Sequence, residues 1–288
     1  MTEPRKSRSL EREAARLKAK QMQKKHERGT KARKFGVQIA VTGGIAGLIA
    51  IVVAVVLIGQ NQVSEKPNDY LLANNIVIGA NLEGFTATHT PKPTATPGVV
   101  LPKTPVKIVI VQDYQCSFCQ AFENANYKQL KQWVQSGAAT VEFRPISFLD
   151  EKGGSLNDYS KRAANSAYCV ASYDPNKFFE YNSYLYANQP AEGTAGPEDS
   201  VLLDAMGRTG VTVDDNMSTC VKTHRFVSWI KDNTNNNYYA GALVPGTKFQ
   251  FTGTPFVMVN GKQYSANTAN DFNNPANLAA FVAQFQSK

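Results

Sequence analysis

The chain has 288 residues, of which 42% are hydrophobic, with a formal net charge of +8 at pH 7 and four cysteines. The positive charge is confined to one end: the first 34 residues hold 13 Lys and Arg against four acidic residues, a net charge of +9, and the rest carries −1. This distribution argues against a nucleic-acid-binding domain, because no basic excess remains beyond the tail.

The basic tail is followed by an uncharged, almost wholly apolar stretch. Its core, residues 37–58, would form a helix about 33 Å long, enough to cross a hydrocarbon layer of ~30 Å. A cleavable signal peptide would have a shorter apolar core with a small-residue cleavage site directly behind it. Because positive flanks stay in the cytoplasm, we predict a cytoplasmic tail at 1–34, a single transmembrane helix in the cell membrane at 35–60, and an extracytoplasmic remainder.

Small residues within this span offer a face on which two copies could dimerise, namely Gly43, Gly47, Ala50 and Ala54. Residues 61–104 are typical of a linker outside the membrane. Within it, Asn75 to Gly79 has the pattern of a short strand that could join a sheet edge, and the stretch from Thr86 to Pro105 is rich in Thr and Pro, as in a partly extended spacer. We therefore place the main domain at 105–288.

The main domain opens with the pattern of a β-α-β unit. Lys107 to Asp113 is a run typical of a buried strand, and Thr140 to Pro145 alternates as a second strand. Between them, apolar residues at helical spacing predict one buried helix face, made of Phe118, Phe122, Leu130, Trp133 and Val134.

A helical insertion is predicted at about 157–240, with a core of small and aromatic residues. The chain then returns to β structure at Pro255 to Val259, turns at Asn260-Gly261, a strong hairpin signal, and continues through Lys262 to Tyr264. A last helix is expected from about Pro275 to Phe285, with Asn274 as its N-cap.

Two cysteines stand at the junction of the first strand and its helix: Cys116-Ser117-Phe118-Cys119. A helix N-terminus presents unpaired N–H groups and a positive dipole end, which favour a thiolate at Cys116. The two-residue spacing brings Cys119 within disulfide reach on the first turn, where it can resolve a mixed disulfide formed at Cys116. The pattern is typical of a redox-active disulfide that works without a further cofactor.

Other chemistries use the same spacing. A c-type haem site needs His directly after the second cysteine, where this chain has Gln120. A zinc site needs about four ligands, and the remaining cysteines, Cys169 and Cys220, are single and distant in sequence, so we expect no metal. A purely structural short-loop disulfide stays open. All four cysteines lie beyond the predicted span, in a compartment where disulfides persist.

Three segments in this order resemble membrane-anchored, DsbA-like thioredoxin-fold proteins of Gram-positive bacteria: Asp-Tyr-Gln-Cys-Ser-Phe-Cys at 113–119, Arg-Ala-Ala-Asn-Ser-Ala-Tyr-Cys at 162–169, and Gly-Thr-Pro-Phe-Val-Met-Val-Asn-Gly at 253–261. The resemblance implies an α/β thioredoxin fold with an inserted helical subdomain, here preceded by a single transmembrane helix. It also implies thiol-disulfide oxidoreductase activity toward exported cysteine-containing proteins and a membrane partner that reoxidises the dithiol. Cys116 would be the nucleophile and Cys119 the resolving thiol.

The resemblance assigns further residues. Thr254-Pro255 would be the family's cis-proline pair beside the dithiol, where the backbone can bind an extended substrate; an ordinary trans bond at a strand start is the alternative. Cys169 and Cys220 match a second disulfide seen in some relatives, the alternative being two buried free thiols.

The chain also departs from the family's pattern. Ser117 stands where relatives usually have Pro, and Ile110 stands where many have a Glu that helps to move protons. Asp113, the nearest acid in sequence, either assumes part of that role or supports the turn before the helix, and Phe118 lies beside the dithiol in sequence.

Three classes of function follow. The first is a membrane-tethered oxidoreductase that forms disulfides in exported proteins. The second is a reductase or isomerase on the same fold. The third is a redox-inert binding or holdase module, in which the Cys116–Cys119 bond is only structural.

Overall fold

The structure is a computed structural model that describes residues 18, 20, 22, 24, 65–67, 71, 74–92, 104–239, 241–265 and 269–286. By its contacts the chain divides into two units, Met1–Val63 and Ser64–Lys288, and almost all described residues belong to the second. The predicted transmembrane helix at 35–60 lies outside the described residues. Among the residues that are described, no helix is both long and apolar enough to span a membrane.

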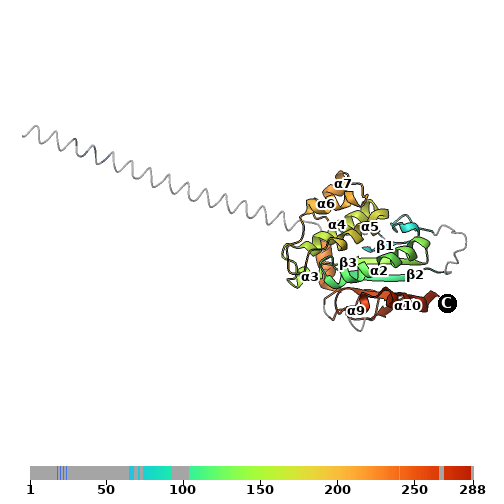
Figure 1. Ribbon diagram of the computed structural model, residues 1–288. Coiled ribbons are helices and arrows are strands. Elements are labelled where there is room, and N and C mark those ends of the chain that lie inside the picture. Colours follow the sequence, from blue (N-terminus) through green and yellow to red (C-terminus); the bar gives the residue numbers. More distant parts are fainter. Residues whose placement is uncertain are drawn as a thin grey trace, which may run out of the picture. The chain divides into compact units, whose positions relative to one another are not determined.

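The second unit contains a β-α-β segment, then a run of helices, and then two strands and a last helical part, in the order that the sequence predicts (Figure 1). Its strands are β1 (Ile76–Ile78), β2 (Val106–Gln112), β3 (Ala139–Pro145), β4 (Phe256–Val259) and β5 (Lys262–Tyr264). Its helices are η3 (Ala80–Leu82), α2 (Ser117–Ser136), α3 (Phe148–Glu151), α4 (Tyr159–Tyr173), η4 (Pro175–Lys177), α5 (Phe178–Ala187), α6 (Asp199–Arg208), α7 (Asp215–Lys222), α8 (Val227–Asn237), α9 (Ala269–Phe272) and α10 (Pro275–Gln286).

The five strands form one sheet in the order β1-β3-β2-β4-β5. β2 and β3 run parallel, as the crossover through α2 requires, whereas β1, β4 and β5 each pair antiparallel with their neighbours. β1 forms the edge strand expected from Asn75 to Gly79. The hairpin between β4 and β5 turns at Asn260 and Gly261, both with positive φ (45° and 75°), as a type I′ turn needs.

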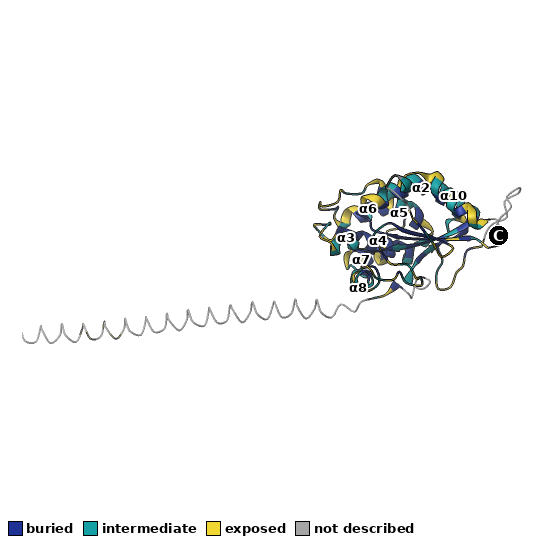
Figure 2. Cartoon of the chain, turned by 90° about the horizontal axis from the view of Figure 1, so that it is seen from below, coloured by how far each residue is buried: buried dark blue, intermediate teal, exposed yellow. Residues whose placement is uncertain are grey.

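The two faces of the sheet follow from the alternation of side chains along each strand. On one face, Ile108, Val141 and Phe143 join the main core with residues of α2, α4, α5 and α10. On the other face, Val109 and Val111 pack with a smaller cluster from the segment before β4. Figure 2 shows the buried strands at the centre, with exposed residues on the outer sides of the helices.

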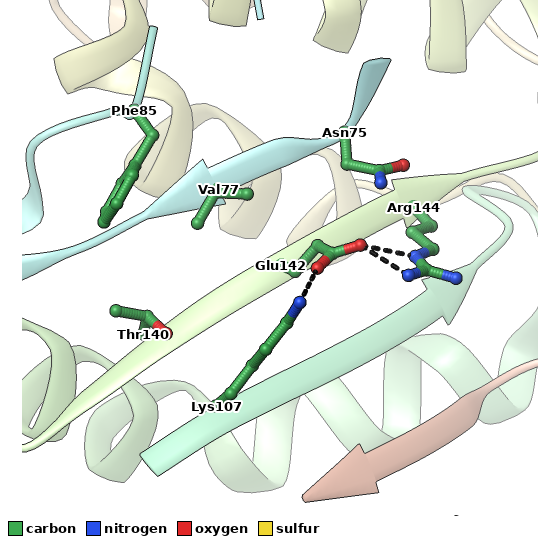
Figure 3. Close-up of a pocket in the computed structure, with 7 residues that line it drawn as sticks. All are labelled: Asn75, Val77, Phe85, Lys107, Thr140, Glu142 and Arg144. Atoms are coloured by element: carbon green, nitrogen blue, oxygen red, sulfur yellow. Dashed lines mark hydrogen bonds and ion pairs between the residues drawn. The ribbon is translucent and has the colours of Figure 1, made fainter. Parts of the chain in front are cut away.

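The second face also carries a charged group. Glu142 is buried between Lys107 Nζ at 2.7 Å and Arg144 Nη2 at 2.6 Å, beside a pocket that Val77 and Thr140 help to line (Figure 3). Two cations neutralise the one carboxylate, so that the charge is paired as burial demands.

Helix α2 lies between α5 and α10 (Figures 1 and 2). It ends at Gly137, whose left-handed backbone (φ 79°) lets its N–H reach Val134 O. α10 begins as predicted: Asn274 Oδ1 accepts the backbone N–H of Ala276 at 3.0 Å. Residues of α2, α5 and α10 share the core on one face of the sheet. Helix α5 also contacts the start of α2, where Gln120 Nε2 donates to Tyr186 O at 2.8 Å.

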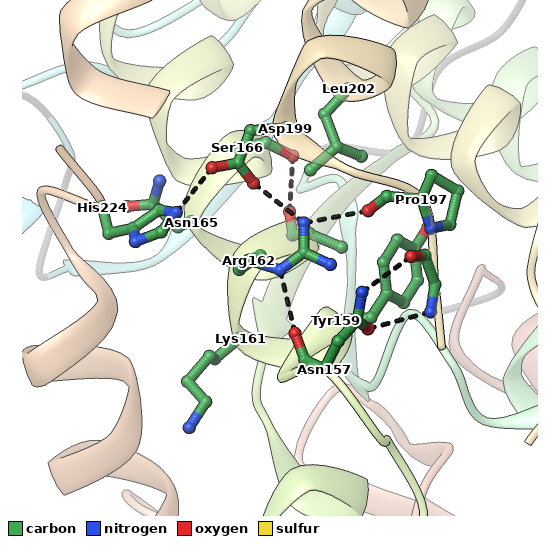
Figure 4. Close-up of polar contacts among 12 residues, drawn as sticks. Asn157, Tyr159, Lys161, Arg162, Asn165, Ser166, Pro197, Asp199, Leu202 and His224 are labelled. Atoms are coloured by element: carbon green, nitrogen blue, oxygen red, sulfur yellow. Dashed lines mark hydrogen bonds and ion pairs between the residues drawn. The ribbon is translucent and has the colours of Figure 1, made fainter. Parts of the chain in front are cut away.

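The insertion is formed by α4 to α8, and its expected aromatic residues are in the core. A disulfide between Cys169 and Cys220 joins α4 to α7. Near the start of α4, Arg162 donates to Asn157 O, Pro197 O and the Asp199 carboxylate, whose other oxygen contacts His224 (Figure 4). These contacts fasten the loop before α6 to α4.

One expectation about α2 is wrong. Phe118 does not belong to the buried helix face, since 49% of its surface is exposed, and Trp133 is only partly buried. Position 118 lies on the exposed side of the first turn of α2, whereas the next residue, Cys119, points into the core. The residues that do anchor the helix are Phe122, Leu130 and Val134.

Candidate functional site

The two cysteines of the motif lie at the junction between strand β2 and helix α2. Cys116 is the N-cap of α2, with extended backbone angles (φ −74°, ψ 119°), and Cys119 lies in the first turn. Both are free thiols here and both are nearly buried, with 5% and 2% of their surfaces exposed. The strand fixes the position of Cys116, and the helix sets Cys119 one turn further on.

The surroundings shift the pKa values of the two thiols in opposite directions. The pKa of Cys116 is lowered, chiefly because the Cys119 thiol donates a hydrogen bond to its sulfur, which outweighs the effect of burial. The pKa of Cys119 is raised well above its ordinary value, first because the group is buried. Of the reduced pair, Cys116 is therefore the thiol that ionises first, and Cys119 keeps its proton to a higher pH.

The loop before β4 lies against Cys116. The Thr254-Pro255 peptide bond is cis, and the Cys116 Sγ is 3.3 Å from Thr254 O. Thr254 and Pro255 also line an open hollow of about 320 Å³ that continues along Gln263 and Tyr264. The reactive sulfur and this hollow thus meet at the same backbone segment.

Asp113 supports the turn that precedes α2. Its Oδ1 accepts from Gln115 N at 2.8 Å and from Ser160 Oγ at 2.7 Å, and its Oδ2 accepts from Leu149 N at 2.9 Å. Burial raises the pKa of Asp113 to about 6 in spite of these bonds. Asp113 therefore supports the turn before α2, which is one of the two roles that the sequence suggested. With a pKa of about 6, it can also release and take up a proton close to neutral pH.

A second buried acid, Glu123, was missed in the sequence. It follows Cys119 by four residues on the same side of α2, and 1% of its surface is exposed. Its Oε1 accepts from Asn182 Nδ2 at 3.1 Å, while Oε2 meets no hydrogen-bond donor among the described residues. Burial raises the pKa of Glu123 to about 7. Ile110, which replaces the family's strand acid, lies in the apolar core.

Asn182 connects this acid to the end of β2. Its Oδ1 accepts from Gln112 Nε2 at 2.6 Å and from Tyr114 Oη at 2.8 Å. Tyr186, one turn further along α5, donates to Asp113 O at 3.2 Å. Helix α5 of the insertion thereby supplies polar partners to the interior behind the dithiol.

The loop that follows α5 contacts the start of α2 from outside. Gln189 Nε2 donates to Cys116 O at 3.0 Å, and Glu192 Oε1 accepts from both Ser117 N at 2.6 Å and Ser117 Oγ at 2.8 Å. Sequence patterns gave no signal for these two residues, because they lie more than 70 positions from the motif in an irregular segment. Phe118, the second residue of α2, is exposed and adjoins Cys119 in the sequence.

The structure thus brings together Cys116, Cys119, Asp113 and the Thr254-Pro255 pair. The remaining pair of cysteines, Cys169 and Cys220, is bonded within the insertion. It is fully buried between α4 and α7 and forms no part of the reactive group.

Comparison with known proteins agrees with this arrangement. The family model described as Thioredoxin matches residues 98–275. Among solved structures, the reduced form of DsbA from Mycobacterium tuberculosis is similar with a TM-score of 0.52 and 21% identity, covering 73% of this chain and 91% of that one. A search of curated proteins gave no match.

Two further structures are similar over most of their length. The disulfide bond oxidoreductase DsbG from Mycobacterium tuberculosis has a TM-score of 0.54 and 22% identity, covering 74% of this chain and 87% of that one. Oxidised BdbD from Bacillus subtilis has a TM-score of 0.53 and 17% identity, covering 76% and 97%. At these identities the likeness concerns the fold.

Proposed function

Since the chain belongs to the thioredoxin family, we propose that it is a thiol-disulfide oxidoreductase that forms disulfide bonds in exported proteins. The observation that carries the proposal is the pair Cys116 and Cys119 at the start of α2, one with a lowered pKa and one with a raised pKa, beside a cis Thr254-Pro255 bond. The fold shared with solved oxidoreductases supports it.

The reaction begins from the disulfide between Cys116 and Cys119. A substrate thiolate attacks the Cys116 sulfur, the bond to Cys119 breaks, and Cys119 leaves as a thiolate that takes up a proton. A second substrate thiolate then attacks the substrate sulfur of the mixed disulfide and releases Cys116. Two electrons pass from the substrate to the protein, and the substrate gains one disulfide. Cys116 is a good leaving group because its pKa is lowered.

Substrates are bound along the hollow beside Thr254 and Pro255. The backbone there is positioned to pair with an extended chain, in the way that a strand edge binds a peptide. The exposed side chain of Phe118 adds an apolar contact next to Cys116.

Trapping tests the chemistry. Cys119→Ser should accumulate mixed disulfides with exported proteins, because Cys116 still exchanges with their disulfides while the neighbouring thiol that could attack Cys116 and free a stalled substrate is gone. Cys116→Ser should accumulate few. Equal trapping by both variants would favour the redox-inert module. The reduction potential then fixes the direction: a value near roughly −120 mV marks an oxidase, and one near roughly −270 mV a reductase.

The proposed oxidoreductase is tethered to the cell membrane through the helix predicted at 35–60, with its dithiol outside and a membrane partner that reoxidises it. The support is the +9 tail followed by an uncharged apolar span in the sequence. A membrane-impermeant thiol reagent on intact cells should not label a cysteine introduced at Thr30 and should label one placed after Gln60. The reverse pattern would refute this topology.

A further inference from the structure

The loop from Asn188 to Glu198, between α5 and α6, is fastened to the start of α2 by several bonds. Besides the bond from Gln189 to Cys116 O, the side chain of Gln115 donates to Ala191 O at 2.9 Å and to Thr194 O at 3.0 Å. These contacts set the loop's backbone on both sides of Glu192, so that its carboxylate is held at the first residue of α2.

The Glu192 carboxylate accepts a hydrogen bond from the first backbone N–H of α2, which has no partner within the helix. Its Oε1 accepts from Ser117 N at 2.6 Å and from Ser117 Oγ at 2.8 Å. Anions at a helix N-terminus are stabilised by the unpaired amides and the positive end of the dipole. In α2 this position is one residue after Cys116, whose thiolate is stabilised by the same end of the same helix.

Two anions therefore share one helix end when Cys116 ionises. In the disulfide and in the protonated thiol only Glu192 is charged there, so its charge acts against the thiolate and hardly affects the oxidised form. A thiolate that is less stable makes the reduced pair less stable and the disulfide a weaker oxidant, because a strong oxidant is one whose reduced form is stabilised.

We infer that Glu192 is a positioning residue that acts through Ser117. Its negative charge reduces the stabilisation that the N-terminus of α2 gives to the Cys116 thiolate, and this makes the dithiol a weaker oxidant. The inference rests on the proposed function. It also gives Ser117 a physical role: its amide and hydroxyl are the two donors that hold the carboxylate, and a proline there would have neither.

Glu192→Gln in the full chain tests the inference, because the amide oxygen can keep both bonds from Ser117 while the charge is removed. The pH dependence of Cys116 alkylation reports the thiolate directly and needs no substrate. We expect the thiolate-to-thiol ratio at fixed pH to rise about two- to five-fold, the range for a charge at a helix end. At a pH above that at which Cys116 ionises, the equilibrium with glutathione, in which two glutathione thiols reduce one disulfide, should move by the same factor toward the reduced protein, roughly 10–20 mV.

Glu198→Gln is the matched control, since this exposed carboxylate begins α6 and caps no amide there; it should leave the ratio unchanged. High salt should shrink the difference between Glu192→Gln and the unchanged chain, because Glu192 is exposed and 1 M salt screens charges beyond ~3 Å. Ser117→Pro, which releases the carboxylate, should shift the ratio in the same direction as Glu192→Gln.

An unchanged ratio in Glu192→Gln would overturn the inference and show that the loop contact only holds the structure. The proposed function would survive that result if Cys119→Ser still traps exported proteins. Conversely, a dithiol that forms no mixed disulfides would defeat the proposed function, while the alkylation profile would still decide whether Glu192 opposes the thiolate.

Discussion

Replacing the buried acid behind the dithiol, by Glu123→Gln, should change how stability depends on pH. The pKa of Glu123 is raised by burial from 4.5 to about 7 in the folded protein. A raised pKa means that the protonated form is favoured by folding, so this stability is fully present below pH 4.5 and is lost as pH rises through about 7. At 1.36 kcal/mol for each pKa unit, the loss is about 3 kcal/mol.

Glutamine keeps the acceptor for Asn182 Nδ2 and has no charge to bury. We therefore expect Glu123→Gln to gain about 3 kcal/mol relative to the unchanged chain between pH 4 and pH 8. The assay is urea unfolding of the full chain in a non-ionic detergent, with Cys116 and Cys119 oxidised so that thiols do not titrate. Asp113 contributes its own pH dependence, which cancels in the comparison.

A stability difference that stays constant from pH 4 to pH 8 would refute the reasoning, since it would mean that Glu123 titrates as it does in water. Glu198→Gln serves as the exposed control and should show a constant difference.

Two further predictions concern the insertion. Replacing Cys169 and Cys220 by Ala removes a disulfide between residues 51 positions apart and should lower the free energy of unfolding by about 4 kcal/mol, as measured by urea unfolding. The pH dependence of Cys116 alkylation should stay the same; a changed alkylation profile at unchanged stability would contradict this. Arg162→Met leaves Asn157 O and Pro197 O without their donor, while Asp199 keeps His224, and should cost about 2 kcal/mol in the same assay; a loss below about 0.5 kcal/mol would show that solvent replaces the contacts.

Much of this fold could be predicted because its signals are local. The Asn260-Gly261 turn follows from residues that tolerate positive φ, and the strand that ends at Gln112 follows from a short apolar run. The insertion was predicted as helical, but its division into the separate helices from α4 to α8 depends on where packing partners lie. Periodicity also placed Phe118 in the core, although spacing alone cannot tell on which side of the first helical turn the core lies, and Cys119 takes that side.

The site was predictable only in its contiguous part. Cys116 and Cys119 form a motif in the sequence, whereas Glu123 looks like any acid on a helix until Asn182, 59 residues later, covers it. Glu192 is 75 residues from Ser117, and nothing in its own segment indicates the contact. Contacts between distant segments are set by the tertiary fold and leave no periodic pattern.

The bond between α4 and α7 also bears on how a new copy of the chain matures. Four thiols can pair in three ways, and only one of these keeps Cys116 and Cys119 together. In the folded molecule Cys169 and Cys220 are sealed between two helices, so that once joined they are removed from exchange with the reactive pair. The insertion thereby prevents mispairing, because a thiolate at Cys116 can no longer form a disulfide with Cys169 or Cys220 of the same molecule.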